Sequence, residues 1–160
     1  MMDFQFTVVE LPDIQVAGMT VETNMEKAMI DCPALWHNFG PRICSELANC
    51  AEISKTGESY GISKMIDENR FTYWAAVQTT RINTLPDDFK TMTIPAGLYV
   101  KGTVPSLEKL GEALTAMYMQ WPQSQTDYQI DMQGVSLELY GINWQPNDPL
   151  EIYAQVIKQS

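Results

Sequence analysis

The sequence predicts an α+β protein in which two pseudo-symmetric β-α-β-β repeats form one antiparallel sheet, with both helices on one face and a ligand cleft at the seam. Two observations support this fold class. Extended, helical and again extended segments follow one another twice, in residues 4–80 and 91–158. The last two extended segments of each repeat flank a polar turn, which is typical of a β-hairpin. We treat residues 1–160 as a single domain, because this length suffices for one substantial core.

The first repeat begins with an extended segment over residues 4–23, broken at Pro12-Asp13. Apolar residues at a spacing of three to four then predict a helix over about residues 25–51. Within it, Pro33 suits the first turn and Pro41 predicts a kink or an interruption. The motifs ESYGISKMI and FTYWAAVQTT complete the repeat as a hairpin.

The second repeat follows the same order. The motif TMTIPAGLYVKGTVP, residues 91–105, is predicted to be extended. The next segment, SLEKLGEALTAMYMQW, has apolar residues on one helical face, with Ser106 as the predicted cap and Pro122 as the predicted end. VSLELYGI and LEIYAQVI form the second hairpin. Residues 80–90 are the predicted linker between the repeats.

An offset of about 79 residues relates the two repeats. It aligns the motif VAG with the motif PAG, Trp74 with Tyr153, and Ser59 with Glu138. Because the identity between the halves is low, the prediction depends on the order of elements rather than on these matches. A duplicated unit of this kind leaves a cleft where its halves meet.

The chain is acidic, with 20 acidic and 10 basic residues and a formal net charge of -10. Nucleic-acid binding depends on lysine and arginine side chains that neutralise phosphates, so we expect no direct contact with nucleic acid. An acidic surface concentrates cations, which favours a cationic partner, but it also keeps a protein soluble. The sequence contains no long apolar run and no signal peptide, so we expect no membrane contact and a cytoplasmic location.

The cysteine and histidine content argues against a metal centre. The three cysteines, at positions 32, 44 and 50, have no C-x-x-C spacing, and His37 is the only histidine. Structural zinc sites need four ligands, usually at tighter spacing. We therefore expect free thiols and neither a metal nor a cofactor.

Glu138 is unusual because it lies among apolar residues in the motif VSLELYGI. A carboxylate in apolar surroundings is costly unless a lysine, solvent, a proton or a cationic ligand compensates it. Strand alternation allows Glu138 to lie on a solvated face of the sheet, whereas an aromatic pocket would make it a binding site for a cation. Glu151 shares strand parity with Tyr153 and is a secondary candidate, with a solvated or ion-paired role as its alternative.

Short motifs recur in a fixed order along almost the whole chain, and they are VAGMTVET, Trp36, SYGI, YWAAVQ, IPAGLYV, MQWP, SLELYG and LEIYAQV. In their order and spacing they resemble the GyrI-like family, which comprises the effector-binding domains of bacterial multidrug-responsive transcription activators and related free-standing proteins. The resemblance implies the predicted fold, without a DNA-binding helix–turn–helix in this chain.

The resemblance also implies a binding site, because drug-sensing members of the family place a buried glutamate in an aromatic pocket between the two halves. The matching residue here is Glu138. Each aromatic candidate also fits a purely structural role in the core. The expected ligand-binding residues are Glu138, Tyr153, Trp36, Tyr60, Trp74 and Tyr118, with Tyr73, Tyr140 and Glu151 as further candidates on the same strands.

The function implied by the resemblance is binding of amphipathic, cationic aromatic compounds, by a sensor or a sequestering module without catalytic residues. Lipophilic cations are then the expected ligands, and a separate DNA-binding regulator is a candidate partner. Two alternatives stay open. One is a hydrolase of strained or alkylating small molecules, in which the pocket glutamate directs water. The other is an inhibitor that acts through protein interaction, for which the sequence shows no long acidic run.

Overall fold

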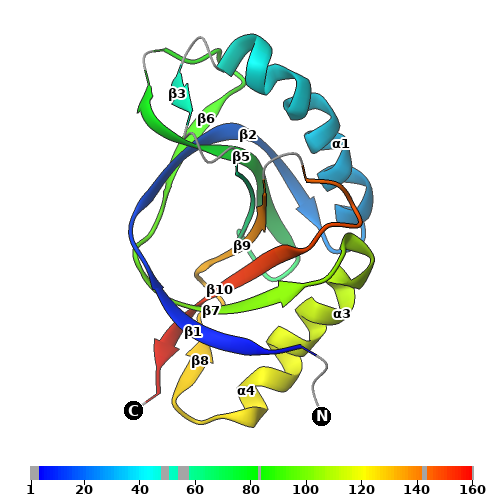
Figure 1. The fold of residues 1–160 in the computed structure, drawn as a ribbon, viewed down its shortest axis with the longest axis vertical. Coiled ribbons are helices and arrows are strands. Elements are labelled where there is room, and N and C mark those ends of the chain that lie inside the picture. Colours follow the sequence, from blue (N-terminus) through cyan, green and yellow to red (C-terminus); the bar gives the residue numbers. More distant parts are fainter. Residues whose placement is uncertain (1–3, 48–50, 54–57, 83, 142–143, 160) are drawn as a thin grey trace.

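The computed structural model describes residues 4–47, 51–53, 58–82, 84–141 and 144–159, and its helices and strands are shown in Figure 1. The strands are β1 (Phe6–Leu11), β2 (Ile14–Asn24), β3 (Ala51–Ile53), β4 (Ser59–Met65), β5 (Arg70–Ile82), β6 (Lys90–Ile94), β7 (Gly97–Val104), β8 (Tyr128–Ile130), β9 (Val135–Tyr140) and β10 (Leu150–Lys158). The helical segments are α1 (Ala28–Arg42), the π-helical turn η1 (Ile43–Leu47), the 3-10 turn η2 (Leu107–Lys109), α3 (Leu110–Thr115), the π-helical turn η3 (Ala116–Gln120) and α4 (Trp121–Ser124).

The sheet joins the two repeats through its central strands. The strand order is β1-β7-β10-β9-β4-β5-β2-β6, with β3 beside β5 and β8 beside β10, and neighbouring strands are antiparallel. The first repeat supplies β4, β5 and β2 on one side, and the second supplies β9, β10 and β7 on the other. The outermost strands are exchanged, because β1 pairs with β7 and β6 pairs with β2. This order confirms the two predicted repeats.

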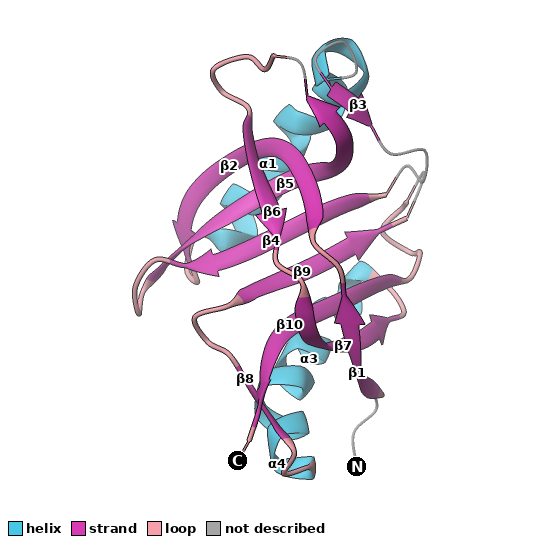
Figure 2. Cartoon of the chain, turned by 90° about the vertical axis from the view of Figure 1, so that its left-hand side faces the viewer, coloured by secondary structure: helices cyan, strands magenta, loops and turns pink. Residues whose placement is uncertain are grey.

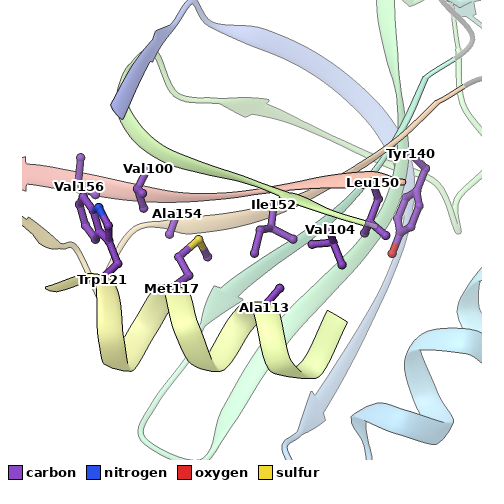
Figure 3. Close-up of a cluster of buried hydrophobic side chains, with 10 residues drawn as sticks. All are labelled: Val100, Val104, Ala113, Met117, Trp121, Tyr140, Leu150, Ile152, Ala154 and Val156. Atoms are coloured by element: carbon purple, nitrogen blue, oxygen red, sulfur yellow. The ribbon is translucent and has the colours of Figure 1, made fainter. Parts of the chain in front are cut away.

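Both helical regions lie on the same face of the sheet, as predicted (Figures 1 and 2). α1 packs on β2 and β5 over a core cluster that includes Phe39, Leu47 and Val77. The second helical region consists of η2, α3, η3 and α4, residues 107–124. It packs on β7 and β10, where Met117 and Trp121 point toward the strands (Figure 3). The sheet curls around its opposite face, which holds a third buried cluster. The space between the two helical regions therefore lies over β4 and β9.

The first helix differs from its predicted course. It begins at Ala28, so Pro33 lies inside the helix and not in its first turn. Proline has no N–H to donate to the carbonyl group four residues earlier in the helix. Because Pro33 is exposed, water can form a hydrogen bond with that carbonyl group instead. Pro41 also lies inside α1, and the helix changes to a π-helical turn soon after it, at Ile43. This π-helical turn is the interruption predicted for Pro41, because proline cannot donate the usual helical hydrogen bond.

The second helical region continues beyond its predicted end. Pro122 lies in the first turn of α4, which directly follows the π-helical turn η3 and runs to Ser124. Ser106 precedes the first helical turn but makes no capping hydrogen bond with its side chain. Instead, the Leu107 N–H donates to the carbonyl oxygen of Pro146 at 2.9 Å. The helix therefore does not end at Pro122 as predicted, whereas Ser106 occupies the predicted cap position but forms no side-chain capping hydrogen bond.

Two strands escape sequence analysis because each has only three residues. β3 and β8 are too short to show alternation, and they pair with the outer parts of β5 and β10. The longer strands have the predicted positions, and the breaks at Pro12-Asp13 and Pro95-Ala96 separate β1 from β2 and β6 from β7.

The two glycines aligned by the repeat offset are required for different reasons. A Cβ atom on Gly18 would lie 1.9 Å from the backbone oxygen of Ala75, because β2 crosses close to β5 at this point. Gly97 has a φ of 144°, a conformation that other residues rarely adopt, and its Cβ position is open. The shared glycine thus reflects two separate backbone constraints.

Gly18→Ala is expected to lower the free energy of unfolding by about 2–3 kcal/mol, because the backbone of β5 cannot yield to the added methyl group. Urea unfolding at neutral pH measures this change. The matched control is Gly111→Ala in α3, where nothing lies within 4 Å of the added atom, and there stability should rise by up to about 1 kcal/mol. Equal effects of the two substitutions would contradict the close approach of β2 and β5.

Candidate functional site

Glu138 lies in β9 at the centre of the sheet, on the face that carries the helices. Its neighbours Leu137 and Leu139 belong to the cluster on the opposite face, and successive strand residues point to opposite sides. Tyr140 shares the helical face with Glu138 and joins the core beneath the second helical region. The alternation of β9 thus directs the Glu138 carboxylate toward the space between the two helical regions.

The Glu138 carboxylate is held by hydroxyl groups. Its Oε1 atom accepts hydrogen bonds from the Tyr73 hydroxyl at 3.1 Å and from the Tyr140 hydroxyl at 2.5 Å. The Trp36 Nε1–H donates to the Tyr73 hydroxyl oxygen at 2.8 Å. The Trp36 ring also meets the Tyr140 ring edge to face, with 5.6 Å between centroids. We call Trp36, Tyr73, Glu138 and Tyr140 the Glu138 cluster.

Gly61 makes the Glu138 cluster sterically possible. It lies opposite Glu138 on β4, the strand between β9 and β5. A Cβ atom on Gly61 would lie 2.3 Å from the Tyr73 hydroxyl and 2.8 Å from Glu138 Oε1. Because this position has no side chain, Tyr73 can reach across β4 from β5 to the carboxylate. A glycine inside a strand often marks such a close approach.

Within the described part of the chain, no lysine or arginine forms an ion pair with Glu138. Burial raises the pKa of the Glu138 carboxyl group above its ordinary value, and the hydrogen bonds from Tyr140 and Tyr73 oppose that shift. Burial, and after it the charge of Glu138, raises the pKa values of both tyrosines. Glu138 itself is only half-buried, so many protein atoms surround its side chain while solvent still reaches the residue.

The second carboxylate oxygen, Oε2, accepts no hydrogen bond from the described residues, and it is not among their buried unpaired atoms. Cys32 and Tyr118 are close enough for the charge of Glu138 to raise their pKa values, although burial is the larger cause for both. Burial and nearby charge raise the pKa of the Cys32 thiol to about 12, so this thiol stays protonated at neutral pH.

The structure therefore brings five of the predicted residues together, namely Trp36, Tyr73, Tyr118, Glu138 and Tyr140. Three neighbours were not predicted, namely Cys32, Gly61 and Ser136. Ser136 shares a hydrogen bond with the Tyr118 hydroxyl. Gly61 alone had a signal in the sequence, because it is an isolated glycine within an alternating strand.

The other four predicted residues lie on the opposite face of the sheet, so they do not line the same site as Glu138. Tyr60 lies opposite Leu139 and Tyr153 lies opposite Leu137, both of which face away from the helices. Strand register places two further residues on that face, and they are Trp74 and Glu151. This corrects the expectation that Tyr60, Trp74 and Tyr153 line the same site as Glu138, whereas the sequence leaves a solvated or ion-paired role open for Glu151.

The alternative interpretation of Glu151 agrees with the structure. Its carboxylate forms an ion pair with Lys101 at 2.6 Å and accepts a hydrogen bond from the Tyr153 hydroxyl at 3.4 Å. Both charged side chains are about one-third exposed. Glu138 and Glu151 thus lie on adjacent strands in different environments: Glu151 is paired with Lys101, whereas Glu138 has no basic partner in the described part of the chain.

The described residues contain no group of three or more histidine, cysteine or acidic side chains arranged to hold a metal ion. No helix among them is long and apolar enough to cross a membrane. Cys32 is a free thiol, and the side chains of Cys44 and Cys50 lie outside the described part.

Residues 7–156 match the model of a family described as integron-associated effector binding protein. The chain belongs to this family. The match covers both repeats and the whole Glu138 cluster, and it confirms the resemblance to effector-binding domains. Among curated protein sequences, no significant match was found.

Solved structures confirm the fold at low sequence identity. An integron cassette protein from the mobile metagenome of Vibrio cholerae has a TM-score of 0.68 and 17% identity, covering 96% of this chain and 97% of that chain. SAV2435, solved with tetraphenylphosphonium, has a TM-score of 0.71 and 14% identity, covering 96% and 94%. The EcmrR C-terminal domain has a TM-score of 0.73 and 14% identity, covering 99% and 100%.

Glu138→Gln is expected to raise the free energy of unfolding at about pH 8 and to lose this advantage toward about pH 5. A carboxyl group whose pKa is raised by folding holds its proton more tightly in the folded state. Its ionisation therefore costs stability as the pH rises through the raised pKa, whereas glutamine stays neutral and still accepts both tyrosine hydrogen bonds. Urea unfolding at both pH values measures the difference.

Glu151→Gln is the matched control for this experiment. It removes the ion pair with Lys101, so stability should stay unchanged or fall by up to about 1 kcal/mol. A Glu138→Gln protein that is less stable than the wild type at the higher pH would show that the Glu138 carboxylate is not strained by burial.

Proposed function

We propose that this protein binds lipophilic, aromatic cations at the Glu138 cluster, as a sensor or a sequestering module. The observation that carries the proposal is a carboxylate that no described lysine or arginine pairs with, set among aromatic rings at the seam of the two repeats. Folding has already placed this charge in costly surroundings. A ligand that brings a positive charge without needing strong hydration is the compound that such a site favours.

The arrangement of the two carboxylate oxygens fits this role. Tyr73 and Tyr140 fix Oε1, while Oε2 accepts no hydrogen bond from the described residues. A cation about 4 Å from the carboxylate gains roughly 4 kcal/mol at an effective dielectric constant of about 20. The fixed hydroxyl groups hold the carboxylate in place before the ligand arrives, so less ordering is required on binding.

The aromatic side chains account for the expected ligand class. Trp36, Tyr73 and Tyr140 surround the carboxylate, and Tyr118 approaches from η3. An aromatic face contributes about 0.5–2 kcal/mol to the binding of a cation. Flat rings also accept many ligand shapes, because they require no directional hydrogen bond. Affinity should therefore depend on charge and aromatic area more than on one exact scaffold.

The comparisons support the proposal at a coarser level. SAV2435, which shares the fold, was solved with the lipophilic cation tetraphenylphosphonium. EcmrR, whose C-terminal domain shares the fold, was solved in a complex with DNA. A role in sensing would require this protein to communicate with a separate DNA-binding regulator, whereas sequestration would require no partner.

Hydrolysis is a second candidate function, favoured by the raised pKa of Glu138. A carboxyl group with a raised pKa is a better general base once it is ionised. A hydrolase from Listeria innocua shares the fold with a TM-score of 0.54 and 10% identity. Chromatography of the recovered compound separates the two functions, because a binding protein returns its ligand intact and a hydrolase does not.

Tryptophan fluorescence tests the proposal, because Trp36 belongs to the cluster. Tetraphenylphosphonium should quench emission saturably, and Glu138→Gln should weaken binding by about 10-fold or more, which corresponds to about 1.4 kcal/mol. The neutral compound triphenylphosphine oxide should bind both proteins equally. Glu151→Gln makes the same chemical change on the opposite face and should leave affinity unchanged.

The proposal fails if the cation shows no saturable binding, or if the two glutamine variants lose affinity equally. Thermal unfolding of each variant at the same pH establishes that the compared proteins are folded.

A further inference from the structure

We infer that the hydroxyl groups of Ser63, Ser136 and Tyr118 form a polar subsite beside Glu138, which favours cations that carry a hydroxyl or amino group one ring away from the charge. This inference rests on the proposed function and names a preference within it. The Glu138 cluster itself explains attraction for a cation but provides no reason to prefer a polar substituent.

Ser63, Ser136 and Tyr118 lie close together where the two repeats meet. Ser136 precedes Glu138 by two residues, so it lies on the same face of β9 at a distance of about 7 Å along the strand. Ser63 is directly opposite Ser136 on β4, where Cβ atoms are typically about 5 Å apart. The Tyr118 hydroxyl reaches Ser136 Oγ from η3 and forms a hydrogen bond with it. Three different elements thus direct hydroxyl groups to one place.

The residues opposite the two serines on the adjacent strands are buried in the two cores, whereas the serines themselves are only half-buried. Across the sheet, Tyr73 is opposite Ser63, and Ala154 is opposite Ser136. Tyr73 is buried in the core beneath α1, and Ala154 is buried in the core beneath the second helical region. Both serines between them stay half-buried. They therefore occupy the interval between two apolar cores, in line with Glu138.

These three hydroxyl groups can form more hydrogen bonds than they form with the described residues. Each hydroxyl can donate one hydrogen bond and accept more, yet Ser136 and Tyr118 share a single one. Ser63 Oγ forms no hydrogen bond with any residue that the structure describes. A polar ligand group can satisfy these atoms, whereas an apolar ligand that covers them leaves them unpaired at a cost. The preference should therefore act between ligands of equal charge and similar shape.

The test compares tetraphenylphosphonium with its (4-hydroxyphenyl)triphenylphosphonium derivative, which differs by one hydroxyl on a ring. Wild-type protein should bind the hydroxylated cation about 5-fold more tightly, the gain of roughly one net hydrogen bond. Ser63→Ala and Ser136→Ala should each reduce this preference toward unity. Tyr118→Phe should act in the same direction, because it retains the ring and removes the hydroxyl. Ser106→Ala, before the second helical region, is the matched control and should keep the full preference.

The outcomes separate this inference from the proposed function. Glu138-dependent binding of tetraphenylphosphonium without any preference for the hydroxylated cation would overturn the inference and leave the proposed function intact. A preference that survives in both serine variants would also overturn it. If neither cation binds saturably, the proposed function fails and the inference fails with it.

Discussion

The organisation of this protein depends on a carboxylate that the fold places between two apolar cores, with no basic side chain paired to it among the residues that the structure describes. Glu138 is fixed by two tyrosine hydroxyls, and one of these is itself fixed by the Trp36 indole. Trp36 packs against both helix-covered cores, so the same ring that supports the hydrogen-bond network also joins the two halves. Such a site costs stability in the free protein, which is common where a binding site is prepared for a charged ligand.

The duplicated architecture explains where this carboxylate lies. Each repeat covers its own part of the sheet with its own helical region, and the central pair β4 and β9 is left between them. On the helical face, this pair carries small or polar side chains at Gly61, Ser63, Ser136 and Glu138. The exchange of β1 and β6 between the halves ties the repeats together at the outer edges of the sheet. The seam can therefore hold polar groups while the two cores supply stability.

Much of the fold follows from the sequence, because alternation and helical spacing are local properties that recur in both repeats. The order of elements and the hairpins were predictable in this way, and so was the position of Glu138 in a strand of the second hairpin. The site was harder to predict, because strand parity decides which aromatic residues accompany Glu138. Tyr60 adjoins Gly61 in β4 and Trp74 adjoins Tyr73 in β5, but a difference of one residue places both aromatic side chains on the other face. Gly61 acts only through the space it leaves, which no pattern of hydrophobicity records.

The most direct test of the central claim is carbon-13 NMR of the Glu138 carboxyl carbon, followed through a pH titration with and without tetraphenylphosphonium. Glu138→Gln identifies the resonance. The proposal predicts a pKa above the ordinary range in the free protein, and a fall in this pKa when the cation binds, because a nearby positive charge favours the ionised form. A Glu138 titration that is unchanged by a saturating cation would contradict the claim that this carboxylate binds the ligand.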